Sequence, residues 1–204
     1  MSMPSAATAG LVNLPNVLTA IRLLCVPVLI VLLTMPPGPS GIPRNLAALV
    51  FVMASVTDIL DGIIARRRGQ VTTFGKLADP IADKALTGTV LIGLSVLGLL
   101  AWWVTVVILI REVGVTVLRL WVIRQRVIPA SRGGKAKTVV QAIAITMYLI
   151  VIPAGLLGPE LASAWDLLRT TVMGAAVVLT VVTGVDYVIQ AVRLRAPVGA
   201  GPST

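Results

Sequence analysis

Long runs of apolar residues, spread over most of the chain, restrict the folds that this sequence can adopt. Six runs lie at about 15–35, 44–66, 82–101, 103–125, 136–157 and 166–192. Each approaches or exceeds the roughly 20 residues that an α-helix needs to cross a bilayer. The runs lack the strict alternation of barrel strands, and lipid-exposed backbone must satisfy its own hydrogen bonds. The sequence therefore predicts an all-α, polytopic membrane protein with six transmembrane helices.

Composition agrees with this fold class. Of the 204 residues, 57% are hydrophobic and 12% are charged, whereas soluble domains carry about 25% charged residues. No soluble insert separates the runs, so we expect one transmembrane domain over 13–193, between a flexible N-terminus (1–12) and a flexible C-terminal tail (194–204). The single cysteine, Cys25, cannot form an internal disulfide. The first run contains Arg22 and is too long for the apolar part of a signal peptide, so we expect it to remain as a span.

Basic residues gather on one side of the predicted spans. The loops after the second and fourth runs are rich in lysine and arginine, whereas the opposite loops contain only Arg44 and, near a span end, Arg169. The positive-inside rule then predicts that both termini are cytoplasmic, as an even number of spans requires. The net charge of +9 is explained by this orientation, by anionic lipids or by an anionic substrate. We expect no nucleic-acid partner.

Four of the eight acidic residues flank the first basic loop. Asp58 and Asp61 are three positions apart and Asp79 and Asp83 are four apart, so each pair shares one face of a helix. Two helices joined by a short loop can be antiparallel neighbours, which predicts that both pairs face one cleft on the cytoplasmic side. Carboxylates this close repel each other unless cations compensate, and their oxygens suit Mg²⁺ or Mn²⁺. Two such ions can bind a diphosphate; the alternative is solvated charges at the ends of a loop.

The residues around these pairs suit a nucleotide. Gly62 and Ala65 are small enough to allow close approach, and Arg66 can bind a phosphate oxygen through two donors. Gly75 is expected to break the chain before the second pair. Asp79-Pro80 resembles a helix start, because aspartate is a good cap and proline suits the first turn.

One stretch resembles the signature of the CDP-alcohol phosphotransferase family at every position: Asp58-x-x-Asp61-Gly62-x-x-Ala65-Arg66, then eight residues, then Gly75-x-x-x-Asp79-x-x-x-Asp83. The resemblance implies six transmembrane helices, a homodimer, two divalent metal ions and CMP as the leaving group. It implies that the metal ligands are Asp58, Asp61, Asp79 and Asp83, with Asp83 also the general base. The residues that it places around the CDP group are Asp58, Gly62, Ala65, Arg66 and Gly75.

Basic residues farther along the chain suggest that the acceptor alcohol carries its own phosphate. Arg111 lies within an apolar run, where an unpaired charge is costly, and Arg119 follows two turns later on roughly the same face. We do not expect Arg111 to pair directly with Glu112, because adjacent helix residues point about 100° apart. Lys135 and Lys137 open the fifth run, where backbone donors also suit an anion. We predict that both arginines and both lysines bind the acceptor phosphate; membrane anchoring is the alternative for the lysines and Arg119.

Three further segments resemble the bacterial members of the family whose acceptor is glycerol 3-phosphate. These are Asn13-Leu14-Pro15-Asn16-x-Leu18-Thr19-x-x-Arg22, Arg111-Glu112 with Leu118-Arg119-x-Trp121, and Gly134-Lys135-x-Lys137-Thr138-x-x-Gln141. The implied reaction transfers the phosphatidyl group of CDP-diacylglycerol to glycerol 3-phosphate. The implied location is the bacterial plasma membrane, with the active site on its cytoplasmic side.

Other readings of the same residues remain open. Members of this family also use phosphatidylglycerol (to make cardiolipin), inositol phosphate or serine as the acceptor. An ion-coupled transporter is an alternative of a different class, but all four aspartates lie at one predicted face, and the other runs contain only Glu112, Asp166 and Asp186 as acids. A prenyltransferase also handles a metal-bound diphosphate, but it does not need the nucleotide elements around Arg66.

Overall fold

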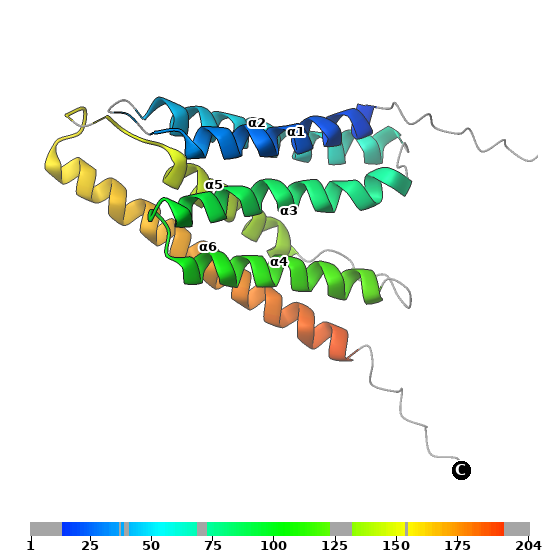
Figure 1. Ribbon diagram of the computed structural model, residues 1–204. Coiled ribbons are helices and arrows are strands. Elements are labelled where there is room, and N and C mark those ends of the chain that lie inside the picture. The colour runs from blue at the N-terminus through cyan, green and yellow to red at the C-terminus, as the bar shows by residue number, and fades with distance from the viewer. Residues whose placement is uncertain are drawn as a thin grey trace, which may run out of the picture. The chain divides into compact units, whose positions relative to one another are not determined.

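The computed structural model is helical over most of the chain that it describes. It describes residues 14–36, 38, 41–68, 73–122, 132–153 and 155–193; within these, the side chains of 14–16, 59–68, 73–78, 119–122, 132–135 and 191–193 lie outside the description. The helices in these ranges are α1 (Leu14–Thr34), α2 (Ile42–Arg68), α3 (Thr73–Val96), α4 (Trp102–Val122), α5 (Arg132–Leu149) and α6 (Pro159–Arg193) (Figure 1). Each predicted apolar run corresponds to one of these helices, so the all-α prediction is confirmed.

Two of the described helices are long and apolar enough to cross a membrane. The qualifying stretches are Val17–Thr34 in α1 and Pro159–Gln190 in α6, and a shorter apolar stretch covers Ala136–Leu149 in α5. Only 22% of each long stretch is buried inside the protein. Such exposure suits helices that meet lipid tails, which are as apolar as the side chains themselves. The two helices therefore indicate association with a membrane.

The start of α3 differs from the expectation. The sequence predicts a break at Gly75 and a helix start at Asp79, whereas α3 begins at Thr73 and includes both residues. Pro80 thus lies inside the helix, where it removes one backbone hydrogen bond. Membrane helices tolerate this loss because neighbouring helices and polar side chains satisfy the freed carbonyl. Pro27 inside α1 is a second example.

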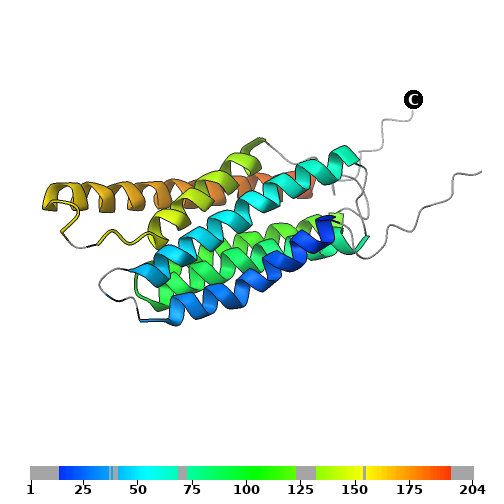
Figure 2. The same cartoon turned by 90° about the horizontal axis from the view of Figure 1, so that it is seen from above.

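The chain divides into two compact units, each considered by itself. Unit 1 contains Met1–Leu100 and Thr146–Gly158, and unit 2 contains Ala101–Ile145 and Pro159–Thr204, so the division falls within α5. In unit 1, α1 packs along both α2 and α3, whereas α2 and α3 hardly touch each other (Figures 1 and 2). In unit 2, α4 packs along α6. Helix α1 is therefore the central element of the unit that carries the aspartates.

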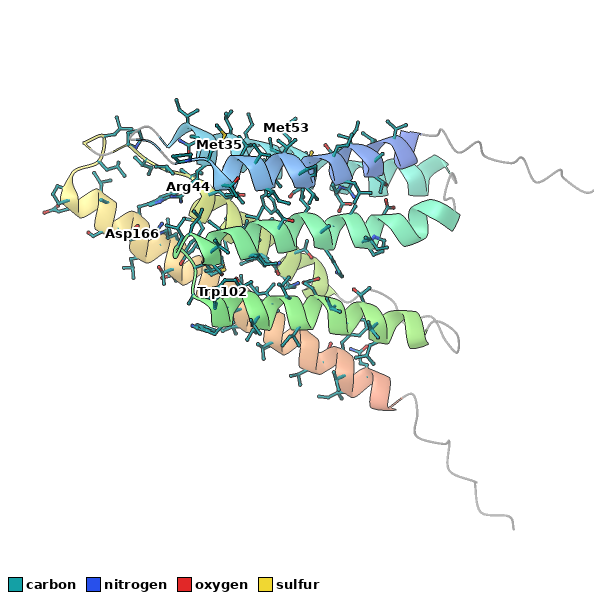
Figure 3. The ribbon with its side chains drawn as sticks, viewed as in Figure 1. Met35, Arg44, Met53, Trp102 and Asp166 are labelled. Atoms are coloured by element: carbon teal, nitrogen blue, oxygen red, sulfur yellow. The ribbon has the colours of Figure 1, made fainter. Side chains whose placement is uncertain are left out.

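The core of unit 1 consists of apolar side chains from α1, α2 and α3. Its largest fully buried members are Leu29, Phe51, Leu86, Leu91 and Leu94, while Met53 lies exposed on α2 (Figure 3). Helices α1 and α3 approach closely at Gly93, where an added Cβ would lie 2.6 Å from Leu33 Cδ1. The absence of a side chain at this position lets the two helices pack tightly.

Polar contacts join the start of α2 to the segment that follows α5 within unit 1. The Arg44 guanidinium (Figure 3) donates to the Tyr148 carbonyl through Nη2 at 2.6 Å. Asn45 exchanges two hydrogen bonds with the backbone of Val151, donating to its carbonyl at 3.0 Å and accepting from its amide at 2.8 Å. Carbonyls near a helix C-terminus lack intrahelical partners, so these side chains complete the end of α5.

We expect Gly41→Ala to destabilise the protein more than Gly38→Ala. Both glycines have positive φ values, +61° and +56°, which cost an alanine about 1–2 kcal/mol. An added Cβ at Gly41 would lie 2.4 Å from Val151 Cβ, whereas one at Gly38 would meet no atom within 4 Å. The overpacking at Gly41 should cost roughly 1–3 kcal/mol more. The free energy of unfolding, measured by SDS titration in mixed micelles, tests this, and equal losses would contradict the close contact.

Candidate functional site

Aspartates from α2 and α3 come together in unit 1. Asp58 lies in α2, and Asp79 and Asp83 lie one helical turn apart in α3. Asp58 contacts Arg22 and Asp79 contacts Thr19, and these two partners lie three positions apart in α1. Asp61 follows Asp58 by one turn in the same helix, but its side chain lies outside the described part of the structure. One carboxylate of each pair thus lies against the same face of α1, while the predicted cleft formed by all four stays a prediction.

Two polar side chains of α1 contact these carboxylates. Arg22 Nη1 lies 2.7 Å from Asp58 Oδ1 in an ion pair, and the Thr19 hydroxyl donates a hydrogen bond to Asp79 Oδ1. Arg22 and Thr19 are each only 2% exposed, whereas the Asp58 side chain is 41% exposed. Thr19 and Arg22 are three positions apart and share one face of α1. That face therefore contacts both helices that carry the aspartates.

The sequence reasoning expected α2 and α3 to be direct neighbours and did not identify Thr19 or Arg22 as residues of the site. Helices α2 and α3 do contact each other, but among the described residues α1 packs more extensively against each of them. A signal was available, because an arginine inside an apolar span needs a partner or access to water. The same requirement for a partner or for water that singles out Arg111 also singles out Arg22.

The donor set fits divalent metal ions such as Mg²⁺ or Mn²⁺. Asp58 and Asp79 offer carboxylate oxygens from two helices, and a cation between them would offset their repulsion. Among the side chains that the structure describes, no three acidic, histidine or cysteine groups gather into a complete ligand set. The fit therefore rests on the Asp58–Asp79 pair and on the helical spacing of Asp61 and Asp83.

The residues predicted to bind CDP lie on both sides of the connection between α2 and α3. Gly62, Ala65 and Arg66 belong to the last turns of α2, and Gly75 belongs to the first turn of α3. Their side-chain positions fall outside the described part of the structure. Their role stays a prediction from the sequence.

The residues predicted to bind the acceptor phosphate lie in unit 2. Arg111 Nη2 donates to Thr183 Oγ1 of α6 at 2.9 Å, and Arg111 Nη1 lies 3.5 Å from Glu112 Oε1. The expectation that adjacent residues cannot pair is wrong, because long side chains converge even when their Cβ atoms point apart. Lys137 Nζ of α5 forms an ion pair with the same Glu112 oxygen, and Lys137 is only 3% exposed.

These contacts form a buried polar group that we call the Glu112 cluster, made of Arg111, Glu112, Lys137 and Thr183. It joins α4 to α5 through the Glu112–Lys137 pair and α4 to α6 through Arg111 and Thr183. Gly184 allows the close packing, because an added Cβ there would lie 3.0 Å from Arg111 Cγ. The sequence identified both cations but not Glu112 as the residue between them.

The other two predicted acceptor-binding residues, Arg119 and Lys135, lie in α4 and α5. Their side chains are outside the described part of the structure. Arg111 and Lys137 are thus the two of the four that the structure brings together.

The whole chain resembles known membrane-lipid enzymes. Residues 12–182 match the family model described as CDP-alcohol phosphatidyltransferase. A relative from Mycobacterium tuberculosis, named probable phosphatidylglycerophosphate synthase, is 53% identical over 188 residues, which cover 92% of this chain and 86% of the relative. Relatives from Rickettsia typhi and Bacillus subtilis, both named CDP-diacylglycerol–glycerol-3-phosphate 3-phosphatidyltransferase, are each 38% identical over 86% of this chain. The matches cover 94% and 93% of those two relatives.

We expect the buried Glu112–Lys137 pair to show stronger coupling than an exposed pair in the same unit. A double-mutant cycle with Glu112→Gln and Lys137→Met should give a coupling free energy of roughly 1–3 kcal/mol, because the two groups are in contact and buried. The control pair is Asp166–Arg169 (Figure 3), where Arg169 Nε lies 3.0 Å from Asp166 Oδ1 and the Asp166 side chain is 62% exposed.

Asp166→Asn and Arg169→Met should show a coupling of at most about 0.5 kcal/mol, since solvent screens an exposed pair. Both cycles use the free energy of unfolding from SDS titration in mixed micelles. Equal coupling in the two pairs would contradict the buried position of Lys137.

Proposed function

This chain belongs to the CDP-alcohol phosphatidyltransferase family, and from that membership we propose that it transfers the phosphatidyl group of CDP-diacylglycerol to glycerol 3-phosphate. The products are phosphatidylglycerophosphate and CMP. The observation that carries this proposal is the 53% identity, over 92% of the chain, to a relative named for phosphatidylglycerophosphate synthesis. Two more distant relatives carry the name of the same transferase activity.

In this proposal the metal site consists of Asp58, Asp61, Asp79 and Asp83, and it holds two ions, Mg²⁺ or Mn²⁺. Support comes from the contacts of Asp58 and Asp79, which lie on separate helices, with one face of α1. When bound, such ions neutralise the diphosphate and stabilise the charge on the leaving oxygen. Arg66, together with Gly62, Ala65, Gly75 and Asp58, is proposed to hold the CDP group.

Asp83 is the proposed general base. Its carboxylate would take the proton of the acceptor hydroxyl, whose oxygen then attacks the phosphorus that carries the diacylglycerol. The bond from this phosphorus to the bridging oxygen breaks, and CMP leaves with the electron pair. A positioned base contributes roughly 10²–10⁴-fold to such a reaction. Asp83 lies one turn beyond Asp79 on the same face of α3, which supports this role.

Arg111, Arg119, Lys135 and Lys137 are the proposed binding residues for the phosphate of the acceptor. The Glu112 cluster supports this assignment, because it holds two of these cations in unit 2. These four cations would attract a dianionic phosphate. Serine and phosphatidylglycerol lack such a phosphomonoester.

We further propose that all six helices cross the bacterial plasma membrane, within a domain covering residues 13–193. Both termini and the active site would then lie on the cytoplasmic side, as the distribution of lysine and arginine predicts. The exposed apolar surfaces of α1 and α6 support insertion into lipid. A homodimer is the assembly proposed from the family resemblance.

The protein should release CMP from CDP-diacylglycerol when glycerol 3-phosphate is the acceptor. The assay uses purified full-length chain in detergent with Mn²⁺ or Mg²⁺, and it adds glycerol 3-phosphate, inositol phosphate, serine or phosphatidylglycerol one at a time. We expect turnover with glycerol 3-phosphate alone, and a loss of at least about 100-fold in Asp83→Asn because the base is removed. Asp166→Asn, an exposed aspartate on α6, is the control that should retain activity.

Turnover with a different acceptor would overturn the role given to the four basic residues while leaving the transfer reaction in place. An absence of turnover with all four acceptors would contradict the enzymatic function and favour the transporter alternative.

A further inference from the structure

We propose that Thr19 and Arg22 of α1 are positioning residues of the metal site, because each holds one carboxylate of the Asp58–Asp79 pair. The inference rests on the proposed metal-binding function of the aspartates and adds two residues that lie outside the aspartate signature. Neither residue is a metal ligand in this proposal, since arginine is always a cation and the threonine donates its proton to Asp79.

The packing of unit 1 makes α1 the element that fixes the distance between the two carboxylates. Among the described residues, α2 and α3 each pack more extensively on α1 than on each other, so α1 contributes most to where Asp58 lies relative to Asp79. Both helices pack along α1, and the two polar contacts come from one face of α1, three residues apart. The separation between the carboxylates therefore follows from the spacing of Thr19 and Arg22.

The burial of the two α1 side chains shows that their contacts are specific. Arg22 is 2% exposed, and a buried arginine is tolerated only when its charge is paired. The hydroxyls of Thr34 and Thr57 donate to carbonyls of their own helices, which is the usual arrangement for a helical threonine. The Thr19 hydroxyl reaches a carboxylate on another helix.

The charges also favour a positioning role. The Arg22 guanidinium lies 2.7 Å from Asp58 Oδ1, so Arg22 offsets the charge of this carboxylate before any cation binds. Arg22 contacts Oδ1 of Asp58 and Thr19 contacts Oδ1 of Asp79, and every carboxylate has a second oxygen that can bind a cation. Groups that orient metal ligands in this way typically change metal affinity or activity by 10–100-fold when they are removed.

Binding of Mn²⁺ alone to the purified full-length chain tests the proposal. Thr19→Val removes the hydroxyl but keeps the shape of the side chain, Thr19→Ser keeps the hydroxyl, and Thr34→Val removes a hydroxyl elsewhere on α1. The dissociation constant is measured from the electron paramagnetic resonance signal of free Mn²⁺. We expect Thr19→Val to weaken Mn²⁺ binding roughly 10–100-fold. Thr19→Ser and Thr34→Val should each weaken it less than about tenfold.

A second measurement separates positioning from a general effect on folding. Circular dichroism in EDTA should show Thr19→Val fully helical at the temperature of the binding measurement, although its melting temperature falls below that of Thr34→Val because Thr19 loses a buried hydrogen bond to a carboxylate. Arg22→Gln should also weaken Mn²⁺ binding. Arg22→Lys should bind Mn²⁺ more tightly than Arg22→Gln does, because it keeps the positive charge. If Arg22→Gln does not fold, the Mn²⁺ affinities of Thr19→Val, Thr19→Ser and Thr34→Val test the proposal.

Unchanged Mn²⁺ affinity in Thr19→Val would overturn the positioning role, while CMP release and its loss in Asp83→Asn would still support the proposed function. Loss of helical structure in Thr19→Val under the conditions of the binding measurement would also overturn it, since weaker binding would then reflect an unfolded protein. Failure of the wild-type chain to bind Mn²⁺ would overturn both the positioning role and the proposed metal site.

Discussion

The buried charge of Arg22 is the constraint on which the arrangement of unit 1 depends. A guanidinium group that is 2% exposed must be paired, because taking an unpaired charge out of water costs several kcal/mol. Its ion pair with Asp58 brings α1 against α2, and Thr19 on the same face brings α1 against α3. Farther along α1, the close approach of Leu33 to Gly93 continues the contact with α3 through apolar groups. Polar pairing and apolar packing thus select the same neighbours for α1.

In unit 2 an ion pair also joins two helices, but there the central group is a carboxylate rather than a cation. There a carboxylate, Glu112, lies among cations, and its pair with Lys137 joins α4 to α5. Buried ion pairs contribute little net stability compared with apolar residues of similar size, but a mismatched partner is costly. Between helices that are otherwise uniformly apolar, such pairs distinguish one packing from the alternatives. In both units the residues that distinguish the packing are also adjacent to, or members of, the proposed binding groups.

Helix number and location were predictable from the sequence because they depend on local patterns. The length of an apolar run and the spacing of polar residues within it suffice to locate the six helices. The start of α3 lies before the predicted position at Asp79, because a helix can continue through Pro80 when the freed carbonyl finds another partner. The Arg111–Glu112 contact was excluded from Cβ directions alone, which neglects the reach of two long side chains. The Thr19–Asp79 contact joins residues 60 positions apart, and periodicity does not say which helix a given face will meet.

Depth in the membrane supplies part of the information that periodicity lacks. With the first end of α1 and the last end of α2 on the cytoplasmic side, as proposed, Arg22 lies eight residues into α1 and Asp58 lies ten residues before the end of α2. At 1.5 Å per residue these depths are about 12 Å and about 15 Å, so the two charges match in level. Thr19 and Asp79 lie five and six residues into α1 and α3, at about 8 Å and about 9 Å. Arg111, another cation inside a helix, has an acid beside it on the same helix in Glu112. A buried cation and an acid at the same depth on separate helices therefore predict a contact between those helices, which neither residue predicts alone.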